Sequence, residues 1–309
     1  MRTRRIGSLE VSVVGLGCNN FGMRIGPEET RAVVDAAIDV GINYFDTAEM
    51  YGGGGRSEEL LGQALGGRRS GVYIATKWGA TPPGVERPGS RDAVMTAVEG
   101  SLARLGTDYI DHYQLHRPDP ATPIEETLGA LAELVDAGKV REIGCSNFDA
   151  AQLDQAAAAA TLGVTGFASV QNQYSLLTRD PETDGVLDAC RRHSIAFVPY
   201  FPLESGVLTG KYRAGEPLPE GTRLAASGDR AARFIDDHRL AIVAAVSDWA
   251  AESGHTVLDA AMSWLAGNAA VATVIAGATR PEQVTANAAA ATWEMTPEQR
   301  AELERVLQG

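Results

Sequence analysis

The sequence predicts an α/β protein in which one domain, residues 1–309, forms a (β/α)8 TIM barrel. Three observations lead to this fold class. Short apolar runs alternate with longer segments of helical spacing almost to the end of the chain. Eight βα units of this length suit a barrel, whose typical size is about 250 residues before insertions. With 309 residues, 44% of them hydrophobic, the chain can bury a core of that size. A doubly wound open sheet is the alternative.

A hairpin is expected to open the chain, with strands at 4–6 and 10–12 around a Gly7-Ser8 turn, and an extra helix at 296–307 to close it. The expected barrel strands are 13–17, 42–45, 72–76, 109–115, 140–144, 168–171, 195–200 and 272–275. Helices are expected at 27–40, 57–65, 90–105, 123–137, 256–266 and 280–290. Residues 209–233, rich in Gly, Pro, Arg and Ser, break this rhythm, and a loop of that length is usually functional or mobile.

Composition excludes several classes of function. The net charge of −13 gives no electrostatic reason for binding nucleic acid or an anionic membrane surface. Three widely spaced cysteines, without a C-x-x-C pair, indicate neither a disulfide framework nor a thiolate zinc site. The basic first residues lead into polar ones, and no apolar run approaches the roughly 18 residues of a membrane span. We therefore expect a cytoplasmic protein with no membrane or nucleic-acid partner.

Three reactive side chains stand where predicted strands end. Asp46, Lys77 and His116 each close one of these strands, and Tyr51 follows Asp46 on its loop. In a (β/α)8 barrel the working groups lie at the C-terminal ends of strands. Alone, each has a structural explanation, since Asp caps helices, Lys reaches toward solvent and His is often hydrogen-bonded in a core. Their occurrence at the same end of neighbouring strands favours an active site.

These four side chains suit proton transfer. A phenol with a pKa near 10 is a weak acid at neutral pH unless its phenolate is stabilised. Lys77 can supply that stabilisation, and Asp46 can supply the counter-charge that keeps a buried ammonium protonated. A neutral His116 would donate a hydrogen bond to a substrate carbonyl oxygen. Tyr51 would then deliver a proton to a carbonyl that receives a hydride.

Four segments closely resemble the aldo-keto reductases: Phe-Asp-Thr-Ala-Glu-Met-Tyr-Gly (45–52), Ala-Thr-Lys (75–77), Gln-Leu-His-Arg-Pro-Asp-Pro (114–120) and Ile-Gly-Cys-Ser-Asn-Phe (143–148). The resemblance runs the length of the chain. In that family the matching residues form a catalytic tetrad, which implies this role for Asp46, Tyr51, Lys77 and His116. The resemblance also implies NADPH, less often NADH, bound without a Rossmann domain. The substrate would be a small-molecule aldehyde or ketone, or an alcohol in the reverse direction.

The resemblance further implies the cofactor contacts. Ser146, Asn147 and Gln171 match residues that hold the carboxamide, and Tyr200 matches one that stacks on the nicotinamide. The stretch 200–211 matches a pyrophosphate loop, whose backbone amides can cradle phosphate, and 277–287 matches the part that contacts the adenosine 2′-phosphate and adenine. The candidates in these two segments are Phe201, Leu203, Ser205, Gly206, Lys211, Gly277, Thr279, Arg280, Gln283 and Asn287. For Arg280 the alternative is a solvated surface charge.

Three features depart from the common patterns. Gly15-x-Gly17 and the run 52–55 lack the third glycine of the dinucleotide fingerprint, so 52–55 is expected to be a flexible turn. Glu204 puts a carboxylate beside the expected pyrophosphate, which is repulsive unless it points outward or meets Arg or Lys. Trp78 either narrows the substrate pocket or packs in the core.

Other site chemistries fit less well. His112 and His116 would lie about 13 Å apart on a strand that rises roughly 3.3 Å per residue, so they cannot share a metal ion. The other histidines lack ligand spacing, and we expect no metal site. No Gly-x-Ser-x-Gly elbow of a serine hydrolase occurs.

The alternative function is a cofactor-binding, redox-sensing regulatory subunit without significant turnover. Some relatives in the family serve potassium channels in this way, and they commonly depart from the tetrad at the His position, whereas His116 is intact. Substrate choice is expected to depend on Phe21, Met23, Met50, Trp78 and the loop 209–233. The apolar side chains among them favour an aliphatic or aromatic carbonyl compound.

Overall fold

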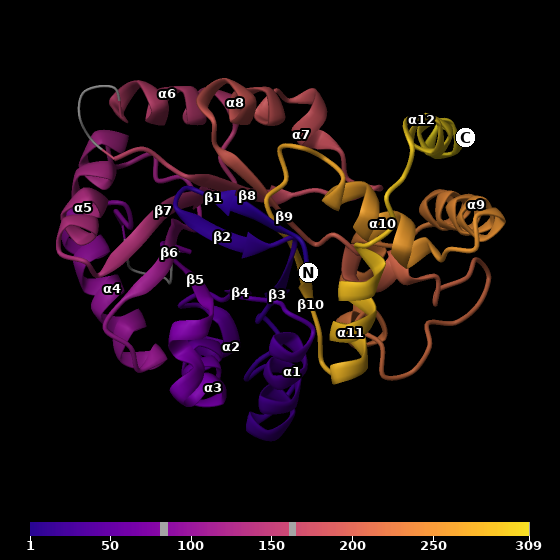
Figure 1. The fold of residues 1–309 in the computed structure, drawn as a ribbon, viewed down its shortest axis with the longest axis horizontal. Coiled ribbons are helices and arrows are strands. Elements are labelled where there is room, and N and C mark those ends of the chain that lie inside the picture. Colours follow the sequence, from indigo (N-terminus) through magenta and orange to yellow (C-terminus); the bar gives the residue numbers. More distant parts are fainter. Residues whose placement is uncertain (81–85, 161–164, 309) are drawn as a thin grey trace.

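The large sheet of the protein closes into a barrel. The computed structural model describes residues 1–80, 86–160 and 165–308. The sheet has eight strands, all paired in parallel, in the order β10-β3-β4-β5-β6-β7-β8-β9. Its two ends meet where Phe197 on β9 accepts from Ala272 N at 2.9 Å and donates to Ala270 O at 2.8 Å. Helices surround the sheet (Figure 1), and the predicted TIM barrel is confirmed.

The strands lie close to the predicted positions. They are β1 (Thr3–Ile6), β2 (Leu9–Ser12), β3 (Val14–Gly17), β4 (Tyr44–Asp46), β5 (Tyr73–Trp78), β6 (Ile110–Leu115), β7 (Val140–Ser146), β8 (Ser169–Gln173), β9 (Ala196–Tyr200) and β10 (Val274–Gly277). Every side chain of β6 is buried, as expected of a strand in a parallel sheet that is covered on both faces. The expected strand boundaries are therefore correct to within about two residues.

Helices follow the strands in the order expected of βα units. The helices are α1 (Pro27–Asp39), α2 (Tyr51–Gly54), α3 (Arg56–Leu65), α4 (Arg91–Leu105), α5 (Ile124–Asp136), α6 (Ala150–Ala160), α7 (Asp180–Thr183), α8 (Val186–His193), α9 (Asp237–Glu252), α10 (Val257–Ala266), α11 (Pro281–Ala290) and α12 (Pro297–Leu307). Short 3₁₀ segments are η1 (Gly66–Gly71), η2 (Glu204–Thr209) and η3 (Ala225–Arg233). No bounds were predicted for α6, α7, α8 or α9. Helix α9 begins after Asp236, whose side chain accepts from Arg239 N at 2.7 Å.

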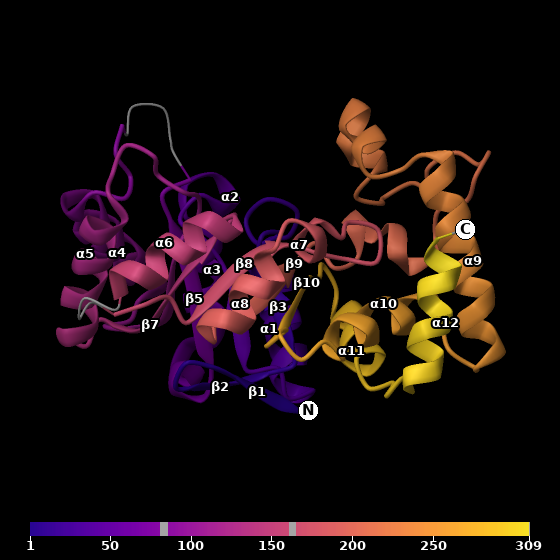
Figure 2. The same cartoon turned by 90° about the horizontal axis from the view of Figure 1, so that it is seen from above.

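The hairpin β1–β2 covers the end of the barrel where the strands begin. Its inward side chains Ile6, Leu9 and Val11 are buried in one cluster with Tyr44 and Val198 of the strands. Glu142 on β7 accepts from Ser8 N at 2.7 Å and fixes the turn of the hairpin to the barrel. Figure 2 shows the hairpin on one side of the barrel and the segment between η2 and α9 on the other. Any site must therefore open at the opposite end, where the strands finish.

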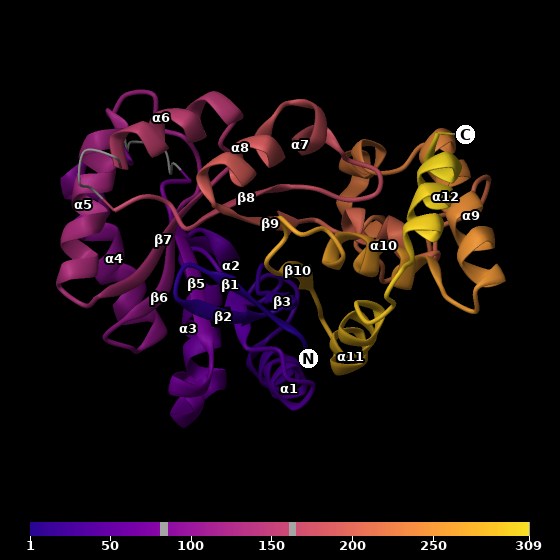
Figure 3. The same cartoon turned by 45° about the horizontal axis from the view of Figure 1, so that its top comes forward.

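The appended helix α12 packs beside α9, away from the strand ends (Figure 3). Trp249 of α9 stacks on Trp293 with ring centroids 5.3 Å apart, and His255 also stacks on Trp293, at 4.0 Å between ring centroids. Among the described residues, no helix is both long and apolar enough to cross a membrane. These helices extend the apolar core beyond the barrel sheet.

Candidate active site

A buried ion pair joins two neighbouring strands at their C-terminal ends. Lys77 Nζ on β5 lies 2.6 Å from Asp46 Oδ1 on β4 and also donates to Thr47 O at 2.9 Å. The side chains are 0% and 4% exposed, so either charge alone would be strongly disfavoured. Burial by itself would lower the pKa of Lys77, but Asp46 and Tyr51 together raise it. The ammonium is therefore held in its charged form.

Tyr51 stands directly above this pair. The Lys77 Nζ atom is 5.2 Å from the centre of its ring. Burial raises the pKa of the phenol, and the lowering by Lys77 does not fully offset it, so the net pKa is raised. The sequence led us to expect Lys77 to make this phenol a stronger acid. Its effect has the expected sign, but desolvation outweighs it.

The turn after Tyr51 is built from glycine. Gly52 to Gly55 all have positive φ, between 72° and 104°, a region that side-chain-bearing residues rarely adopt. A Cβ on Gly52 would also come within 2.8 Å of Phe21 O. The run 52–55 is thus a left-handed turn that directly follows Tyr51.

His116 follows β6 and faces Tyr51. Its ring centre lies 5.8 Å from that of Tyr51, with the rings nearly perpendicular at 83°. Burial, then the charges of Lys77 and Arg117, lower the pKa of His116 to about 3, so the imidazole is neutral at physiological pH. Its Nδ1 atom is buried without a hydrogen-bond partner among the described residues.

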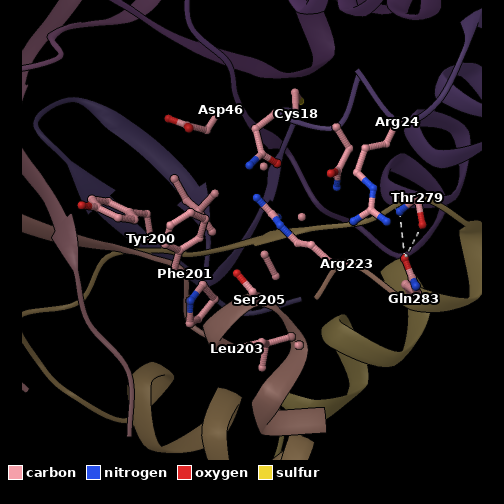
Figure 4. Close-up of a pocket in the computed structure, with 18 of the residues that line it drawn as sticks. Cys18, Arg24, Asp46, Tyr200, Phe201, Leu203, Ser205, Arg223, Thr279 and Gln283 are labelled. Carbon is pink, nitrogen blue, oxygen red and sulfur yellow. Dashed lines mark hydrogen bonds between the residues drawn. The ribbon is translucent and has the colours of Figure 1, made fainter. Parts of the chain in front are cut away.

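These groups open into a cavity of about 800 Å³ at the strand ends. Asp46, Tyr51 and His116 line it, and Lys77 lies behind them. Every residue that the sequence suggested for the cofactor also lines this cavity, and Figure 4 labels several of them. The structure therefore brings the whole predicted set to one place, although it does not by itself assign their roles.

A hydrogen-bonded network connects the strand ends. Gln171 Nε2 donates to Asp46 Oδ2 at 2.8 Å, and Ser146 Oγ donates to Gln171 O at 2.6 Å. Asn147 Nδ2 donates to His116 O at 2.9 Å, while its Oδ1 accepts from Tyr200 at 2.8 Å. The donors of Asn147 and Ser146 are thus engaged by protein, which leaves mainly acceptor capacity for a ligand.

The loop after β9 is strained where it passes the cavity. Phe201, Glu204 and Ser205 have positive φ values of 53°, 45° and 57°, although none is glycine. Such conformations cost about 1 to 3 kcal/mol each and cluster at functional sites. Successive residues of this kind turn backbone N–H groups toward one concavity, which suits an anion. Lys211 Nζ lies over the loop, within 2.8 Å of where a Cβ on Gly206 would be.

Glu204 does not face the cavity. Its buried carboxylate accepts from Ser175 Oγ at 2.6 Å and Gln173 Nε2 at 3.3 Å. Arg239 Nη1 of α9 lies 3.6 Å from its other oxygen. The repulsion that its sequence position suggested is avoided because the side chain points into the protein and meets an arginine.

The sequence is similar to that of known proteins over most of its length. The profile described as Aldo/keto reductase family matches residues 13–308. The chain belongs to the aldo/keto reductase family. It is 36% identical over 298 residues to a protein of Arabidopsis thaliana named probable voltage-gated potassium channel subunit beta, covering 93% of this chain and 90% of that one. It is 39% identical over 230 residues to an aldo-keto reductase, yakc [NADP(+)], of Schizosaccharomyces pombe, covering 71% of this chain and 66% of that one.

A solved structure gives the same result. The glycerol dehydrogenase AKR11B4 from Gluconobacter oxydans superimposes with a TM-score of 0.83 and 30% identity, covering 99% of this chain and 95% of that one. Members of the aldo/keto reductase family are oxidoreductases that use nicotinamide cofactors. The cavity at the strand ends is the part of this family member that suits such chemistry.

Three arginines of the cavity, Arg24, Arg117 and Arg223, were not among the residues expected from the sequence. Arg24, in the loop after β3, and Arg223, in the loop before α9, both line it and are labelled in Figure 4. Burial and the nearby charge of Arg24 lower the pKa of Arg223, whose guanidinium lies 5.4 Å from the Phe201 ring centre. A signal for Arg223 existed, since it lies in the irregular stretch 209–233, which was expected to be functional.

The apolar residues expected to set substrate choice lie elsewhere. Phe21 and Trp78 are buried in the core, and Trp78 stacks on Tyr113 at 4.4 Å between ring centres. Met23 and Met50 are exposed, at 67% and 49%, and do not line the cavity. Only the loop 209–233 among those candidates contributes to the lining.

His112 has a structural role. Its Nδ1 is 2.7 Å from Tyr44 Oη and its Nε2 is 3.0 Å from Ser169 Oγ, so both ring nitrogens are satisfied inside the barrel. Burial lowers its pKa to about 3. Within the described part of the chain, no three His, Cys, Asp or Glu side chains form a group that could hold a metal ion.

Proposed function

We propose that this protein reduces an aldehyde or ketone to an alcohol with NADPH, and catalyses the reverse oxidation when product is in excess. The observation that carries the proposal is the placement of Tyr51 and His116 on the cavity, directly above the buried Asp46–Lys77 pair. A phenol and a neutral imidazole that share one cavity wall can both reach one carbonyl oxygen.

The cavity has features that fit a dinucleotide. Five cations line it, and four of them, Arg24, Lys211, Arg223 and Arg280, lie on the segments expected to bind phosphate or on loops of the same cavity; none forms an ion pair with another described residue. Unpaired arginines in a chain of net charge −13 indicate a site for an anion, here the pyrophosphate and 2′-phosphate. When bound, the cofactor supplies a hydride from its nicotinamide.

We assign the carboxamide to the network at the strand ends. Gln171 is oriented by its donation to Asp46, so its Oε1 is left to accept from the carboxamide amine. Asn147 offers a remaining acceptor site on Oδ1, and the ring of Tyr200 forms the wall against which a nicotinamide can stack. Gln171 would thus bind the cofactor while it donates to Asp46, the carboxylate that also pairs with Lys77.

We assign the proton transfer to Tyr51. Its raised pKa keeps the hydroxyl protonated at neutral pH, so it is always available as an acid. As it gives up the proton, the charged Lys77 stabilises the phenolate, and Asp46 keeps that ammonium in place. Lys77 therefore stabilises the transition state more than it stabilises the resting enzyme. This explains how a phenol with a raised pKa can act as an acid.

We assign the orientation of the carbonyl to His116. Because its pKa is about 3, the ring is neutral and carries one proton. We place the proton on Nε2, from which it can be donated to the carbonyl oxygen, because Nδ1 is buried and has no acceptor among the described residues. Such a donor stabilises the negative charge that develops as the hydride arrives.

The 2′-phosphate is assigned to Arg280 together with Thr279, at the N-terminus of α11, where unpaired backbone N–H groups favour an anion. Gln283 Oε1 accepts from Thr279 N at 2.8 Å and shapes this turn (Figure 4). A guanidinium that is exposed and free of carboxylates suits a phosphate better than a ribose hydroxyl. This supports NADPH over NADH.

A second candidate is a regulatory subunit that binds the cofactor without significant turnover. The similarity to the Arabidopsis protein named as a potassium channel subunit beta favours it. The intact set Asp46, Tyr51, Lys77 and His116 favours the enzyme, since a buried ion pair at a cavity is costly without a use.

Fluorescence titration with NADPH and NADH, followed by NADPH oxidation with a panel of aldehydes, ketones and quinones, separates these functions. Submicromolar NADPH binding together with turnover of at least one carbonyl supports the reductase. Binding without turnover across the panel supports the regulatory subunit. Absence of binding by either nucleotide contradicts both.

A further inference from the structure

Arg117 follows His116 and lines the same cavity. Its side chain is exposed to solvent, and it makes no hydrogen bond or ion pair with another residue of the described chain. After burial and Lys77, its charge helps to lower the pKa of His116, and it opposes the rise that burial causes in the pKa of Tyr200, so the guanidinium acts at the end of the cavity that holds these two side chains. An unpaired cation at this position has no role in the proposed proton transfer.

The backbone that carries Arg117 is fixed on both sides. His116 N donates to Trp78 O at 2.8 Å, and His116 O accepts from Asn147 Nδ2 at 2.9 Å. Pro118 follows and restricts the next φ angle. The backbone at Arg117 is therefore already ordered. Binding a ligand then has to order only the rotamers of the side chain.

The nearest acidic residue in the sequence is already engaged. Asp119 accepts from Gly89 N at 2.8 Å, Ala121 N at 2.9 Å and Thr122 Oγ1 at 2.6 Å. These three bonds hold its carboxylate in the loop after β6. The undescribed residues 81–85 contain no acidic side chain in the sequence. Arg117 thus keeps its charge free for a ligand.

The other cavity cations, Arg24, Lys211, Arg223 and Arg280, are assigned to the phosphates of the dinucleotide, and of these Arg223 also interacts with Tyr51. Figure 4 shows Arg24 and Arg223 in the part of the cavity that also holds Ser205, Thr279 and Gln283. Those positions account for the phosphates of the dinucleotide. Arg117 is set apart from them by its attachment to His116.

We propose that Arg117 selects carbonyl substrates that carry an oxyanion, either a carboxylate or a phosphate. This assignment rests on the proposed reductase function and names its substrate class. The guanidinium forms charge-assisted hydrogen bonds to the oxyanion while His116 and Tyr51 contact the carbonyl oxygen. The contact also positions the substrate, because it fixes the end of the molecule that does not react.

Matched substrates test this assignment. The first pair is 4-carboxybenzaldehyde and its methyl ester, and the second is glyceraldehyde 3-phosphate and glyceraldehyde. For the wild-type protein we expect kcat/KM to favour the anionic member of at least one pair by about 10- to 100-fold, the usual worth of a charged hydrogen bond. The pair that shows the preference distinguishes carboxylate from phosphate.

Three variants identify the residue responsible. Arg117→Gln should bring the ratio of kcat/KM between the pair members close to one, and Arg117→Lys should retain part of the preference. Arg31→Gln removes an exposed arginine on α1, away from the cavity, and should leave the ratio unchanged. Raising the salt concentration should reduce the preference in wild type, because a partly exposed ion pair is screened.

A binding measurement separates the substrate class from the reaction itself. Calorimetric titration of the NADPH-loaded protein with 4-(hydroxymethyl)benzoate, and with its methyl ester, reports affinity without turnover, because an alcohol cannot accept the hydride of NADPH. Tighter binding of the acid, lost in Arg117→Gln, supports the proposal even if no carbonyl is reduced, which would contradict only the proposed function. Equal affinity for acid and ester together with equal kcat/KM for glyceraldehyde 3-phosphate and glyceraldehyde, or an unchanged ratio in Arg117→Gln with active enzyme, would overturn the role of Arg117 and leave the reductase intact.

Discussion

At the end of the barrel where the strands begin, hairpin side chains such as Ile6, Leu9 and Val11 fill the space between the strands. At the other end the strands open into a cavity of about 800 Å³, where polar and charged groups stand beside apolar ones such as Phe201 and Ile275. The first end gains stability from buried apolar area. The second end lacks this stabilisation, and some of its polar and charged groups have no partner in the protein. This is the pattern expected at a site where a ligand supplies the missing partners.

His112 and His116 show the same contrast within one stretch of chain. Burial lowers the pKa of both to about 3. His112 has a partner for each ring nitrogen, whereas His116 Nδ1 has none in the described residues. A lowered pKa therefore does not by itself mark a functional histidine. What distinguishes the two is whether the hydrogen-bonding capacity is used by the protein.

Backbone strain follows the same division. Among described residues other than glycine, five have positive φ, and Asn147, Phe201, Glu204 and Ser205 of these border the cavity or its loop. The fifth, Ser194, caps the C-terminus of α8, where such a conformation is ordinary. Strain is thus concentrated at the mouth, where backbone N–H groups must face a ligand.

The largest effect is expected for Tyr51→Phe. The hydroxyl acts only in proton transfer, so kcat should fall on the order of 10²- to 10⁴-fold while the Kd for NADPH stays the same. Steady-state kinetics and fluorescence titration on the same preparation measure both quantities. Activity within a factor of about three of wild type would remove Tyr51 from the mechanism.

The ion pair beneath Tyr51 is expected to affect both stability and activity. Lys77→Met leaves Asp46 buried without its cation, which should lower the free energy of unfolding by about 3 to 5 kcal/mol and abolish most turnover. Arg91→Met, which breaks an exposed pair with Glu133, is the control and should leave the free energy of unfolding nearly unchanged. Similar losses of stability in the two variants would contradict the account of the buried pair.

The two histidines allow a matched experiment. His112→Leu leaves the hydroxyls of Tyr44 and Ser169 without partners and should cost about 1 to 3 kcal/mol of stability. His116→Leu removes a donor to substrate and should lower kcat/KM by roughly 10²-fold with a smaller loss of stability. Denaturant unfolding and kinetics on both variants test this. An exchange of the two phenotypes would show that the assignment of roles is wrong.

Stability should also depend on pH through His112. Its folded pKa of about 3 lies below the ordinary value of 6.5, so between these values the unfolded chain binds more protons. Stability is complete above pH 6.5 and falls as the pH decreases, by about 2 kcal/mol between pH 6.5 and 5 for this one group. His112→Gln, whose side chain does not titrate, should show a correspondingly shallower slope. An identical slope in wild type and variant would exclude His112 as a source.

The smallest effect is expected for Arg280→Gln. Loss of one guanidinium beside the 2′-phosphate should weaken NADPH binding by about 10-fold and leave NADH binding nearly unchanged. Arg305→Gln, at the far helix α12, is the control. Equal losses for both nucleotides would place the 2′-phosphate elsewhere in the cavity.

The sequence predicted most of what depends on local pattern. The barrel strands, the hairpin and α12 follow from apolar periodicity and capping residues, and each expected site residue lies on one cavity or directly behind it. The strand ends identified the Asp46, Lys77 and His116 cluster because a parallel barrel brings all its strand ends together. That residues 1–309 form one domain stays a prediction.

Features that depend on contacts between distant segments could not be predicted. The pairing of Glu204 with Arg239 joins the loop after β9 to α9, and no local pattern encodes it. The pKa of Tyr51 depends on the balance between burial and Lys77, which only the packed structure sets. Phe21 and Trp78 are apolar residues near the site in sequence, but their side chains pack into the core.

The central claim is that Tyr51 and His116 complete a hydride transfer to a carbonyl at this cavity. Incubation with NADPH deuterated on the transferred position of nicotinamide C4, and a carbonyl from the active panel, tests it by mass spectrometry of the product. The account predicts one deuterium on the carbinol carbon, formed by wild type and at a greatly reduced rate by Tyr51→Phe. Tight binding of the nucleotide without labelled alcohol, for every carbonyl tried, would contradict it.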